Sequence, residues 1–469
     1  MPSLSWLFKF ALLNRKPRSL KEAKEFHALL ITTGLKSPHT LGKLIEDCCA
    51  LSPQKIPHHA RLIVDREIDR QVLLLNTLIR CSQPRDSILL FANWVSKCSY
   101  VYDDHTFIFS LGACARLPPS SALCEGKQIH TRAFKLGFMS YLMVSTTVVH
   151  FYASNEDIGS ARKMFDEMPA RSIVTWNALI TGYSSQKQNP KENSVMALTY
   201  FNEMLADESD AKPNDTTMVC VLRAASRLGT LDIGTCIHGY IVKTIAAPEE
   251  DVFVGTGLLD MYSKCGCLSI ASKVFFMMEE KNVLTWTAMA TGLAFHGRGK
   301  EAIEILAQMK SRYMRPNAVT FTSVLAACCQ AGLIEEGLRL FHNMEREFGV
   351  TPQIEHYGCI VDLLGREGYL KEAYNFVVRM PIRPDPILWR TLLGSCRLHG
   401  DTQMGERVGR ILLRAQPDAH LRDITAPGQD YIALSNVYAL AGRWQDVGVV
   451  RGEMKIKGVE IKPGSSAIH

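Results

Sequence analysis

Between Asp251 and Asp385 the apolar and polar residues form four consecutive pairs of segments. In each pair the first segment is largely apolar and is followed by a turn containing glycine. The second segment carries a small residue and ends near a methionine. Apolar residues at helical spacing predict amphipathic helices, and a glycine after the first segment is typical of a helix end. The pattern predicts four helix–turn–helix units here, and much of the remaining chain repeats it.

The copies recur at regular intervals along the chain. Thr146 and Trp176 are followed 110 residues later by Thr256 and Trp286. A self-similarity of about a hundred residues, divided into three hairpins of about 31 to 42 residues, is typical of an α-solenoid. In such a fold each unit buries its apolar face against its neighbours. The expected fold class is therefore all-α, a right-handed α-solenoid of helix-turn-helix repeats.

The composition fits a folded chain without a metal or a cofactor. Hydrophobic residues make up 47% of the 469 residues and charged residues 21%, which excludes a disordered chain. A net charge of +6 permits binding to a polyanion without demonstrating it. No apolar run approaches the roughly 18 residues of a membrane span. The 14 cysteines contain no Cys-x-x-Cys pair, so we expect buried thiols rather than disulfides or zinc ligands.

Three histidines recur at one place in the repeat. His27, His130 and His238 occupy equivalent positions in the second helices of three different units. Equivalent positions of a solenoid lie far apart, so these side chains cannot converge on one metal ion. We expect them to be hydrogen-bonded histidines at helix interfaces.

The first 20 or so residues have the composition of a targeting segment. Lys9, Arg15, Lys16 and Arg18 are basic, and no acidic residue precedes Glu22. Lys9 interrupts the continuous apolar core that a secretory peptide needs, so an organelle transit peptide fits better. The alternative is an ordinary first helix of the solenoid.

Several stretches resemble the consensus of a known repeat family. They are WNALITGY (Trp176–Tyr183), DVFVGTGLLDMYSKCG (Asp251–Gly266), EGKQIH (Glu125–His130) and FDEMP (Phe165–Pro169). These stretches, and unit lengths that cycle long, longer, short, resemble the plant pentatricopeptide repeat family in its PLS subclass. The two units after Asp385 resemble the paired E motifs of that family. The tail KPGSSAIH then ends, which identifies the chain as an E-type member without the C-terminal DYW deaminase domain.

The resemblance suggests a division of the chain into five parts. They are a probable organelle transit peptide (1–20), degenerate N-terminal repeats (21–71), a PLS-type array of about nine repeats (72–385), two E-type helical motifs (386–462) and a short C-terminal tail (463–469).

The resemblance implies sequence-specific binding of single-stranded organellar RNA, with one repeat per base. In that family the fifth and last residues of a repeat face the Watson–Crick edge of the base. The second residue and its counterpart in the next repeat sandwich the base. The implied base-recognition residues are Asn76, Asp103, Thr146, Ser172, Asn177, Asn214, Thr256, Asn282, Thr287, Asn317, Gly358 and Asp385. The implied base-sandwiching residues are Leu73, Met143, Val174, Phe253, Leu284 and Val319.

Most of the recognition positions hold small hydrogen-bonding groups, as readers of base edges should. Helix capping is the alternative, because Asn, Asp and Thr favour the residue directly before a helix, where the last residues stand. Capping accounts well for Asn214 and Asn317. It accounts less well for the fifth residues, which fall inside the first helical turn.

The absence of the residue patterns that a nucleotide deaminase needs argues against an enzyme. A zinc nucleotide deaminase needs His-x-Glu and a distant Pro-Cys-x-x-Cys, and neither pattern occurs. The resemblance instead implies a site-recognition factor for organellar C-to-U RNA editing that recruits a DYW-type deaminase or other editing factors in trans. An organellar RNA stability or splicing factor and a protein-binding helical-repeat scaffold are the alternatives. The expected compartment is the mitochondrion, with the chloroplast as the alternative.

Overall fold

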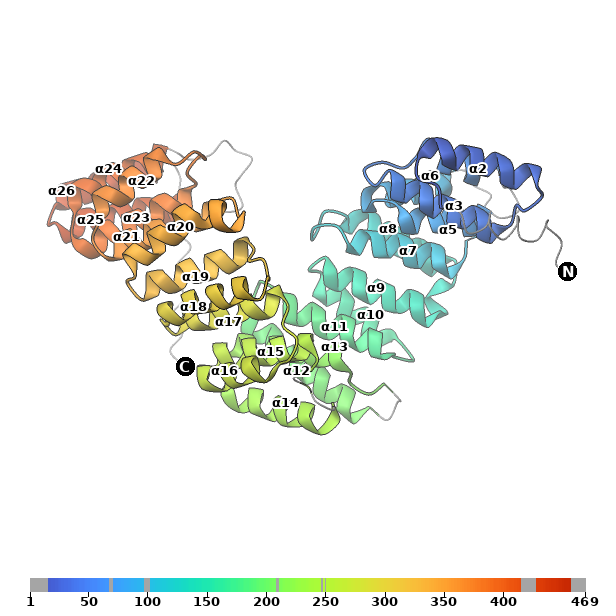
Figure 1. Cartoon of the computed structure of the whole chain (residues 1–469), viewed down its shortest axis with the longest axis horizontal. Coiled ribbons are helices and arrows are strands. Elements are labelled where there is room, and N and C mark those ends of the chain that lie inside the picture. Colours follow the sequence, from blue (N-terminus) through green and yellow to red (C-terminus); the bar gives the residue numbers. More distant parts are fainter. Residues whose placement is uncertain are drawn as a thin grey trace. The chain divides into compact units, whose positions relative to one another are not determined.

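The computed structural model describes residues 16–66, 71–96, 102–207, 211–245, 248, 250–414 and 427–456. Within these ranges every regular element is a helix, which confirms the all-α solenoid prediction (Figure 1). No described helix combines the length and the apolarity needed to cross a membrane. Most of the expected transit peptide (1–15) and the whole tail (463–469) lie outside the described residues.

The chain divides into two compact units, Met1–Leu228 and Gly229–His469. The first contains α2 (Leu20–Thr32), α3 (Pro38–Leu51), α4 (His58–Arg66), α5 (Gln71–Cys81), α6 (Pro84–Ser96), α7 (Asp104–Ala115), α8 (Leu123–Lys135), η2 (Phe138–Ser140), α9 (Leu142–Ser154), α10 (Ile158–Glu167), α11 (Ile173–Ser185), α12 (Pro190–Ala206) and α13 (Asp215–Leu228). The second contains α14 (Leu231–Thr244), α15 (Val252–Lys264), α16 (Leu268–Met277), α17 (Val283–Phe295), α18 (Gly299–Ser311), α19 (Ala318–Gln330), α20 (Ile334–Phe348), α21 (Ile354–Arg366), α22 (Leu370–Arg379), α23 (Pro386–His399), α24 (Thr402–Arg414), α25 (Pro427–Leu440) and α26 (Trp444–Ile456).

Within each unit the first helices of successive hairpins pack against one another. In the first unit α5, α7, α9, α11 and α13 follow in this way, and in the second α15, α17, α19, α21, α23 and α25. Within each unit a second helix packs on the first helix of its own hairpin, as α6 does on α5 and α16 on α15, so the two sets form two layers. All first helices of a unit run in the same direction in the hairpin pattern, so their N-termini lie along one edge of their layer.

Small residues allow the helices to approach closely, as the sequence predicts. Ala161, Ala271 and Ala302 are completely buried. At Gly126 an added Cβ would lie 2.1 Å from the Phe151 ring, closer than any real Cβ contact. Close packing of this kind leaves no room for a larger residue.

The aromatic core repeats with the sequence. The ring centroid of Trp176 lies 4.8 Å from that of Phe165, and the centroid of Trp286 lies 5.0 Å from that of Phe275. Both pairs have the edge-to-face geometry that aromatic rings favour. The 110-residue recurrence is thus a recurrence of one packing arrangement.

The recurring histidines lie at helix interfaces, as predicted. Nδ1 of His130 lies 2.9 Å from the Tyr152 hydroxyl, and Nδ1 of His238 lies 2.7 Å from the Tyr262 hydroxyl. The His27 ring packs edge-on against that of His59. Burial lowers the pKa of His130 below its ordinary value.

The cysteines follow the prediction only in part. All described cysteines are free thiols, and burial raises the pKa of Cys48 to about 11 and that of Cys114 to about 12. Such thiols are largely unreactive, because the thiolate is the nucleophile. Cys124 and Cys236 are exposed, however, so the prediction of burial is wrong for these two. Both lie on second helices, whose outer faces are solvated.

Candidate nucleic-acid interface

The residues that the sequence singles out meet where one unit joins the next. In the unit that begins at Val283, Leu284 is the second residue, Thr285 the third, Thr287 the fifth and Asn317 the last. Asn317 also directly precedes α19, the first helix of the next unit. The last residue of one unit is therefore the N-cap of the next.

The second positions carry exposed apolar side chains. Exposure runs from 53% at Leu73 to 65% at Phe253 among the predicted residues Leu73, Met143, Val174, Phe253, Leu284 and Val319. A core position would be buried, and a purely solvent-facing position would more often be polar. Within the second compact unit, Phe253, Leu284 and Val319 belong to three successive repeats and give a row of exposed apolar side chains that can pack on flat ring faces.

Where the fifth residue is threonine, a buried threonine connects it to the last residue. Oγ1 of Thr287 lies 2.7 Å from Oγ1 of Thr320, which in turn donates to Oδ1 of Asn317 at 3.0 Å. Thr320 is the third residue of its unit and is completely buried. The structure thus brings the fifth and last positions together through a residue that belongs to the following unit.

The same connection occurs at two other joins. Thr256 lies 2.8 Å from Thr285, which donates to Asn282 at 3.1 Å. Thr146 lies 2.7 Å from Thr175, whose Oγ1 lies 3.0 Å from that of Ser172.

Where the fifth residue is asparagine, it reaches the last residue directly. Nδ2 of Asn76 donates to both carboxylate oxygens of Asp103, at 2.8 and 2.9 Å. Nδ2 of Asn177 donates to Oδ1 of Asn214 at 3.2 Å, and Oδ1 of Asn177 accepts from Thr217 at 2.6 Å. The longer side chain at the fifth position therefore adds a direct contact with the last residue, and at Asn177 the threonine connection is kept beside it.

The last residues are also helix caps. Oδ1 of Asn317 accepts from the backbone N–H of Thr320 at 2.9 Å, and Oδ1 of Asn282 accepts from that of Thr285 at 3.0 Å. Capping and a ligand-facing role can coexist, because an asparagine amide has one oxygen and one NH₂ group. The cap uses the oxygen, which leaves the NH₂ group as a donor for a ligand.

The role of the threonines at the third position was not predicted from the sequence. Thr106, Thr175, Thr217, Thr285 and Thr320 are all completely buried. The sequence shows a threonine three residues after each of these capping residues. A threonine at this position is also explained by helix capping alone, so it did not indicate a contact with the preceding unit.

The pattern changes toward the last predicted repeat. Gly358 has no side chain, and Asp385 caps α23 by accepting from the Leu388 N–H at 2.9 Å. The third residue of this unit is His356, whose Nε2 lies 2.9 Å from the carbonyl oxygen of Ala318. The side-chain pairing seen at the other joins is therefore impossible between Gly358 and Asp385.

One further join carries an ion pair, with a cation at the fifth position. Arg390, the fifth residue of the unit that begins at Pro386, donates to Asp430 through Nε at 2.6 Å and through an Nη at 2.9 Å. The Asp430 side chain is 7% exposed. Such a bidentate pair holds both side chains in place.

Positive charge lies beside the last positions. The Arg171 guanidinium stacks 4.7 Å from the Phe165 ring centroid, and the Lys281 amine lies 5.2 Å from that of Phe275. These residues directly precede Ser172 and Asn282. Burial, with a smaller effect of nearby Arg312, lowers the pKa of Lys281. The cations are held in place by aromatic rings next to the groups proposed to contact bases.

Comparison with known proteins decides the family. The pattern described as "PPR repeat" matches residues 144–173, 174–208, 256–283 and 319–347, and the "PPR repeat family" and "E motif" patterns match residues 281–330 and 421–469. The pentatricopeptide repeat-containing protein At3g18970 of Arabidopsis thaliana is 48% identical over 98% of each chain. The chain belongs to the pentatricopeptide repeat family.

Further members of the family are similar over most of the chain. The Arabidopsis protein At1g59720, named as chloroplastic/mitochondrial, is 35% identical over 96% of this chain and 70% of its own length. The crystal structure of the pentatricopeptide repeat protein PPR10 from maize has a TM-score of 0.63 at 15% identity, covering 93% of this chain and 61% of that one. The crystal structure of PPR10 in complex with an 18-nt psaJ RNA element has a TM-score of 0.60 at 14% identity, covering 94% of this chain and 72% of that one. At this identity the solved structures show the shared solenoid fold.

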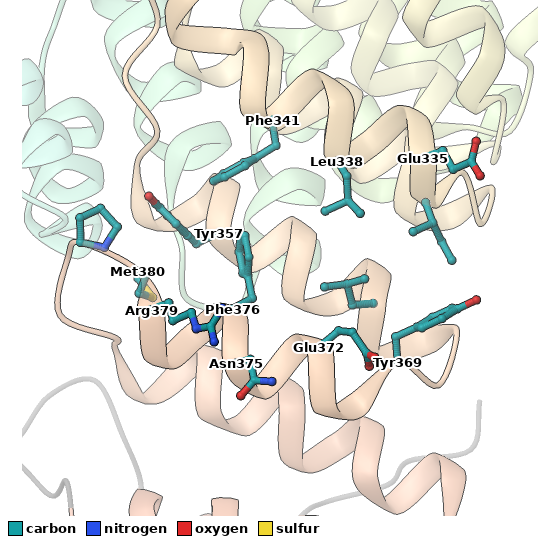
Figure 2. Close-up of a pocket in the computed structure, with 13 residues that line it drawn as sticks. Glu335, Leu338, Phe341, Tyr357, Tyr369, Glu372, Asn375, Phe376, Arg379 and Met380 are labelled. Carbon is teal, nitrogen blue, oxygen red and sulfur yellow. The ribbon is translucent and has the colours of Figure 1, made fainter.

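This pentatricopeptide repeat protein also has a cavity of about 690 Å³ away from the second positions (Figure 2). Its wall includes Phe341, Tyr357 and Phe376, whose ring centroids lie 5.0 to 5.6 Å apart. Neither a cysteine nor a histidine lies among the residues described around it. The cavity lies between helices α20, α21 and α22, and its lining includes the carboxyl groups of Glu335 and Glu372.

Among the described residues, one group could approach a metal ion, formed by Asp103, Asp104 and His105. Both Asp103 oxygens accept from Asn76, and Nδ1 of His105 lies 3.0 Å from an Asp104 oxygen. These carboxylates already have protein partners. The absence of a metal and of a cofactor stays a prediction.

Proposed function

We propose that this protein binds single-stranded RNA in a sequence-specific manner and acts as a site-recognition factor for organellar C-to-U RNA editing. The observation that carries the proposal is the repeated join, with an exposed apolar second residue and a fifth residue tied to the last. Leu284, Thr287 and Asn317 form one such set. A flat apolar contact beside a small polar pair suits a base face and a base edge. The RNA complex of PPR10 supports this assignment.

The proposal assigns base recognition to the fifth and last residues and base sandwiching to the second residues. By the family's pairing rules, Asn76 with Asp103 favours uracil, and Asn177 with Asn214 favours a pyrimidine. Thr256 with Asn282 and Thr287 with Asn317 favour adenine. With the N-terminus toward the 5′ side, the target then contains U, two unread bases, a pyrimidine, one unread base and two adenines. The edited cytidine lies a few nucleotides 3′ of them.

In this proposal the protein is not itself the deaminase. It recruits a DYW-type deaminase or other editing factors in trans through the helical pairs of residues 386–462. The absence of His-x-Glu and Cys-x-x-Cys in the sequence supports this assignment, because zinc must activate water beside a carboxylate. Cytidine conversion by the purified protein, in the absence of any deaminase, would count against it.

The proposed compartment is the mitochondrion, with the chloroplast as the alternative. The basic, acid-free start of the chain and the organelle names of relatives support an organelle. A fluorescent fusion of the first 60 or so residues should enter the organelle. A fusion that stays cytosolic would contradict this.

Two experiments separate the candidate functions. Binding to short single-stranded RNAs that carry the predicted base order should exceed binding to RNAs in which that order is scrambled, at one fixed salt concentration. Equal binding would contradict base recognition, and no binding would favour a protein-binding scaffold. Sequencing organellar transcripts of a loss-of-function line then separates the remaining candidates. Loss of an editing factor leaves one cytidine unconverted, whereas loss of a stability or splicing factor changes transcript level or splicing.

A further inference from the structure

One tyrosine adopts a backbone conformation that normally requires glycine. Tyr313, in the loop between α18 and α19, has φ +57° and is 97% exposed. A left-handed conformation is a genuine outlier for a bulky residue, because its Cβ crowds the backbone. The tyrosine ring gains no compensating burial, so the fold alone does not account for it.

The neighbouring unit shows what the turn prefers. Gly349 lies four residues before Gln353, the N-cap of α21, just as Tyr313 lies four residues before Asn317. Its φ is +69°. In both turns the next backbone N–H donates to the preceding helix, from Met314 to Met309 at 3.0 Å and from Val350 to Met344 at 3.2 Å. Glycine therefore adopts the left-handed conformation without strain at the equivalent distance from the next helix, in a turn whose closing hydrogen bond is one residue wider.

The position of Tyr313 favours an RNA ligand. The loop leads directly into Asn317, so the two residues are at most about 14 Å apart along an extended chain. Arg312 lies over the Trp286 ring, and Arg315 is exposed. No acidic residue occurs in the sequence between Glu304 and Glu335. An exposed aromatic ring among cations, at the edge that holds the last residues, suits a base and its phosphate.

We infer that Tyr313 stacks on a base of the bound RNA, beside the base assigned to Thr287 and Asn317, while Arg315 contacts the adjoining phosphate. This inference rests on the proposed RNA-binding function. It adds a contact outside the second, fifth and last positions. The ring supplies affinity rather than base selection, because every base has a flat face.

Tyr313→Gly should act in opposite directions on stability and on RNA binding. Tyr313→Gly should raise the Tm of the full chain, because the strained conformation is relieved. The same change should weaken binding about five-fold or more, as expected for a lost base–aromatic stack. The probe is a set of short single-stranded RNAs carrying the predicted base order. Tyr313→Phe keeps the ring and should leave affinity unchanged.

Glu156 provides a matched control. It also has a positive φ, of +63°, in the turn between α9 and α10, where sister units have Gly266 and Gly368. This turn lies at the opposite end of the first helices from the capping residues. Glu156→Gly should raise the Tm and leave RNA affinity unchanged.

The outcomes are distinct. If the wild-type chain binds and Tyr313→Gly binds equally well, the stacking inference fails while the proposed function stands. A Tm that falls on Tyr313→Gly, or a Tyr313→Phe variant that binds as weakly as the glycine variant, also overturns it. If the wild-type chain binds none of these RNAs, the proposed function fails and the inference fails with it.

Discussion

The amide of Asn76 donates to both carboxylate oxygens of Asp103, although the two residues are 27 positions apart. The pair joins two successive hairpins, because Asp103 also caps α7 by accepting from the Thr106 N–H at 2.8 Å. Oδ1 of Asn76 is buried and has no hydrogen-bond partner. A buried acceptor without a donor is unusual.

We predict that Asp103→Asn moves the preference at this base from uracil toward cytosine. The carboxylate can only accept, which suits the ring N–H of uracil, whereas an amide can also donate to the unprotonated ring nitrogen of cytosine. The change in relative affinity should be on the order of 1–3 kcal/mol. Competition between RNAs that differ at this base measures it.

Asn214→Asp is the reciprocal control, because Asn177 with Asn214 is the matching pair at another join. It should move the preference at its own base toward uracil. A parallel loss of affinity for both pyrimidines in either variant would contradict base recognition and leave only a structural role.

Thr320→Val tests the buried threonine that connects two units. Valine has the same shape but no hydroxyl, so Thr287 loses a partner and Asn317 loses a donor. We expect the free energy of unfolding to fall by about 1–3 kcal/mol, the usual effect of leaving buried polar groups unpaired. Discrimination between adenine and guanine at this base should also weaken. Denaturant unfolding and RNA competition measure the two effects.

Thr322→Val is a matched control on the same helix. Its hydroxyl donates to the Ala318 carbonyl within the helix, and the side chain is half-buried. The loss of this bond should change stability by less than the change at Thr320. Equal losses at the two positions would show that Thr320 contributes only as an ordinary helix residue.

Local residue patterns predicted the helices better than they predicted the contacts between them. Ser172 and Asn317 were expected directly before a helix, because capping is a local effect, and both cap one. The link from Thr287 through Thr320 was not predicted, because it depends on the offset between two helices. That offset is set by packing of residues far apart in sequence. The exposure of Cys124 was missed for a related reason, since helix periodicity alone does not show which face a neighbour covers.

A pH dependence should follow from His130. Burial holds its pKa below the ordinary 6.5, so the folded state resists a proton that the unfolded state accepts. Above pH 6.5 His130 is neutral in both the folded and the unfolded state, so its protonation does not lower the free energy of unfolding. As the pH falls below 6.5 the unfolded state is protonated first, so stability declines until the folded pKa is reached. The buried Nε2 has no partner to accept such a proton.

His130→Gln removes this titration, so the decline in Tm between neutral pH and about pH 5 should be shallower than in the wild type. The variant need not match the wild-type Tm at neutral pH, because the contact with Tyr152 also changes. Only the slope matters for the test. Identical slopes in the two proteins would exclude His130 as a source of acid sensitivity.

The last prediction concerns Asn317, which serves both as a cap and as a proposed reader. Asn317→Asp retains the oxygen that accepts from Thr320, and a carboxylate is favourable at a helix N-terminus, so the fold should be preserved. The change replaces only the NH₂ group.

Asn317→Asp should therefore shift the preference at the second adenine toward guanine. A carboxylate accepts from the ring N–H and the amino group of guanine, whereas the free NH₂ group of Asn317 can donate to an acceptor nitrogen of adenine. One altered base contact should change relative affinity by about 1–3 kcal/mol, measured by competition between the two RNAs. Equal weakening toward adenine and guanine would show that Asn317 is a cap and not a reader. If neither affinity changes, the assignment of repeats to bases is in the wrong register.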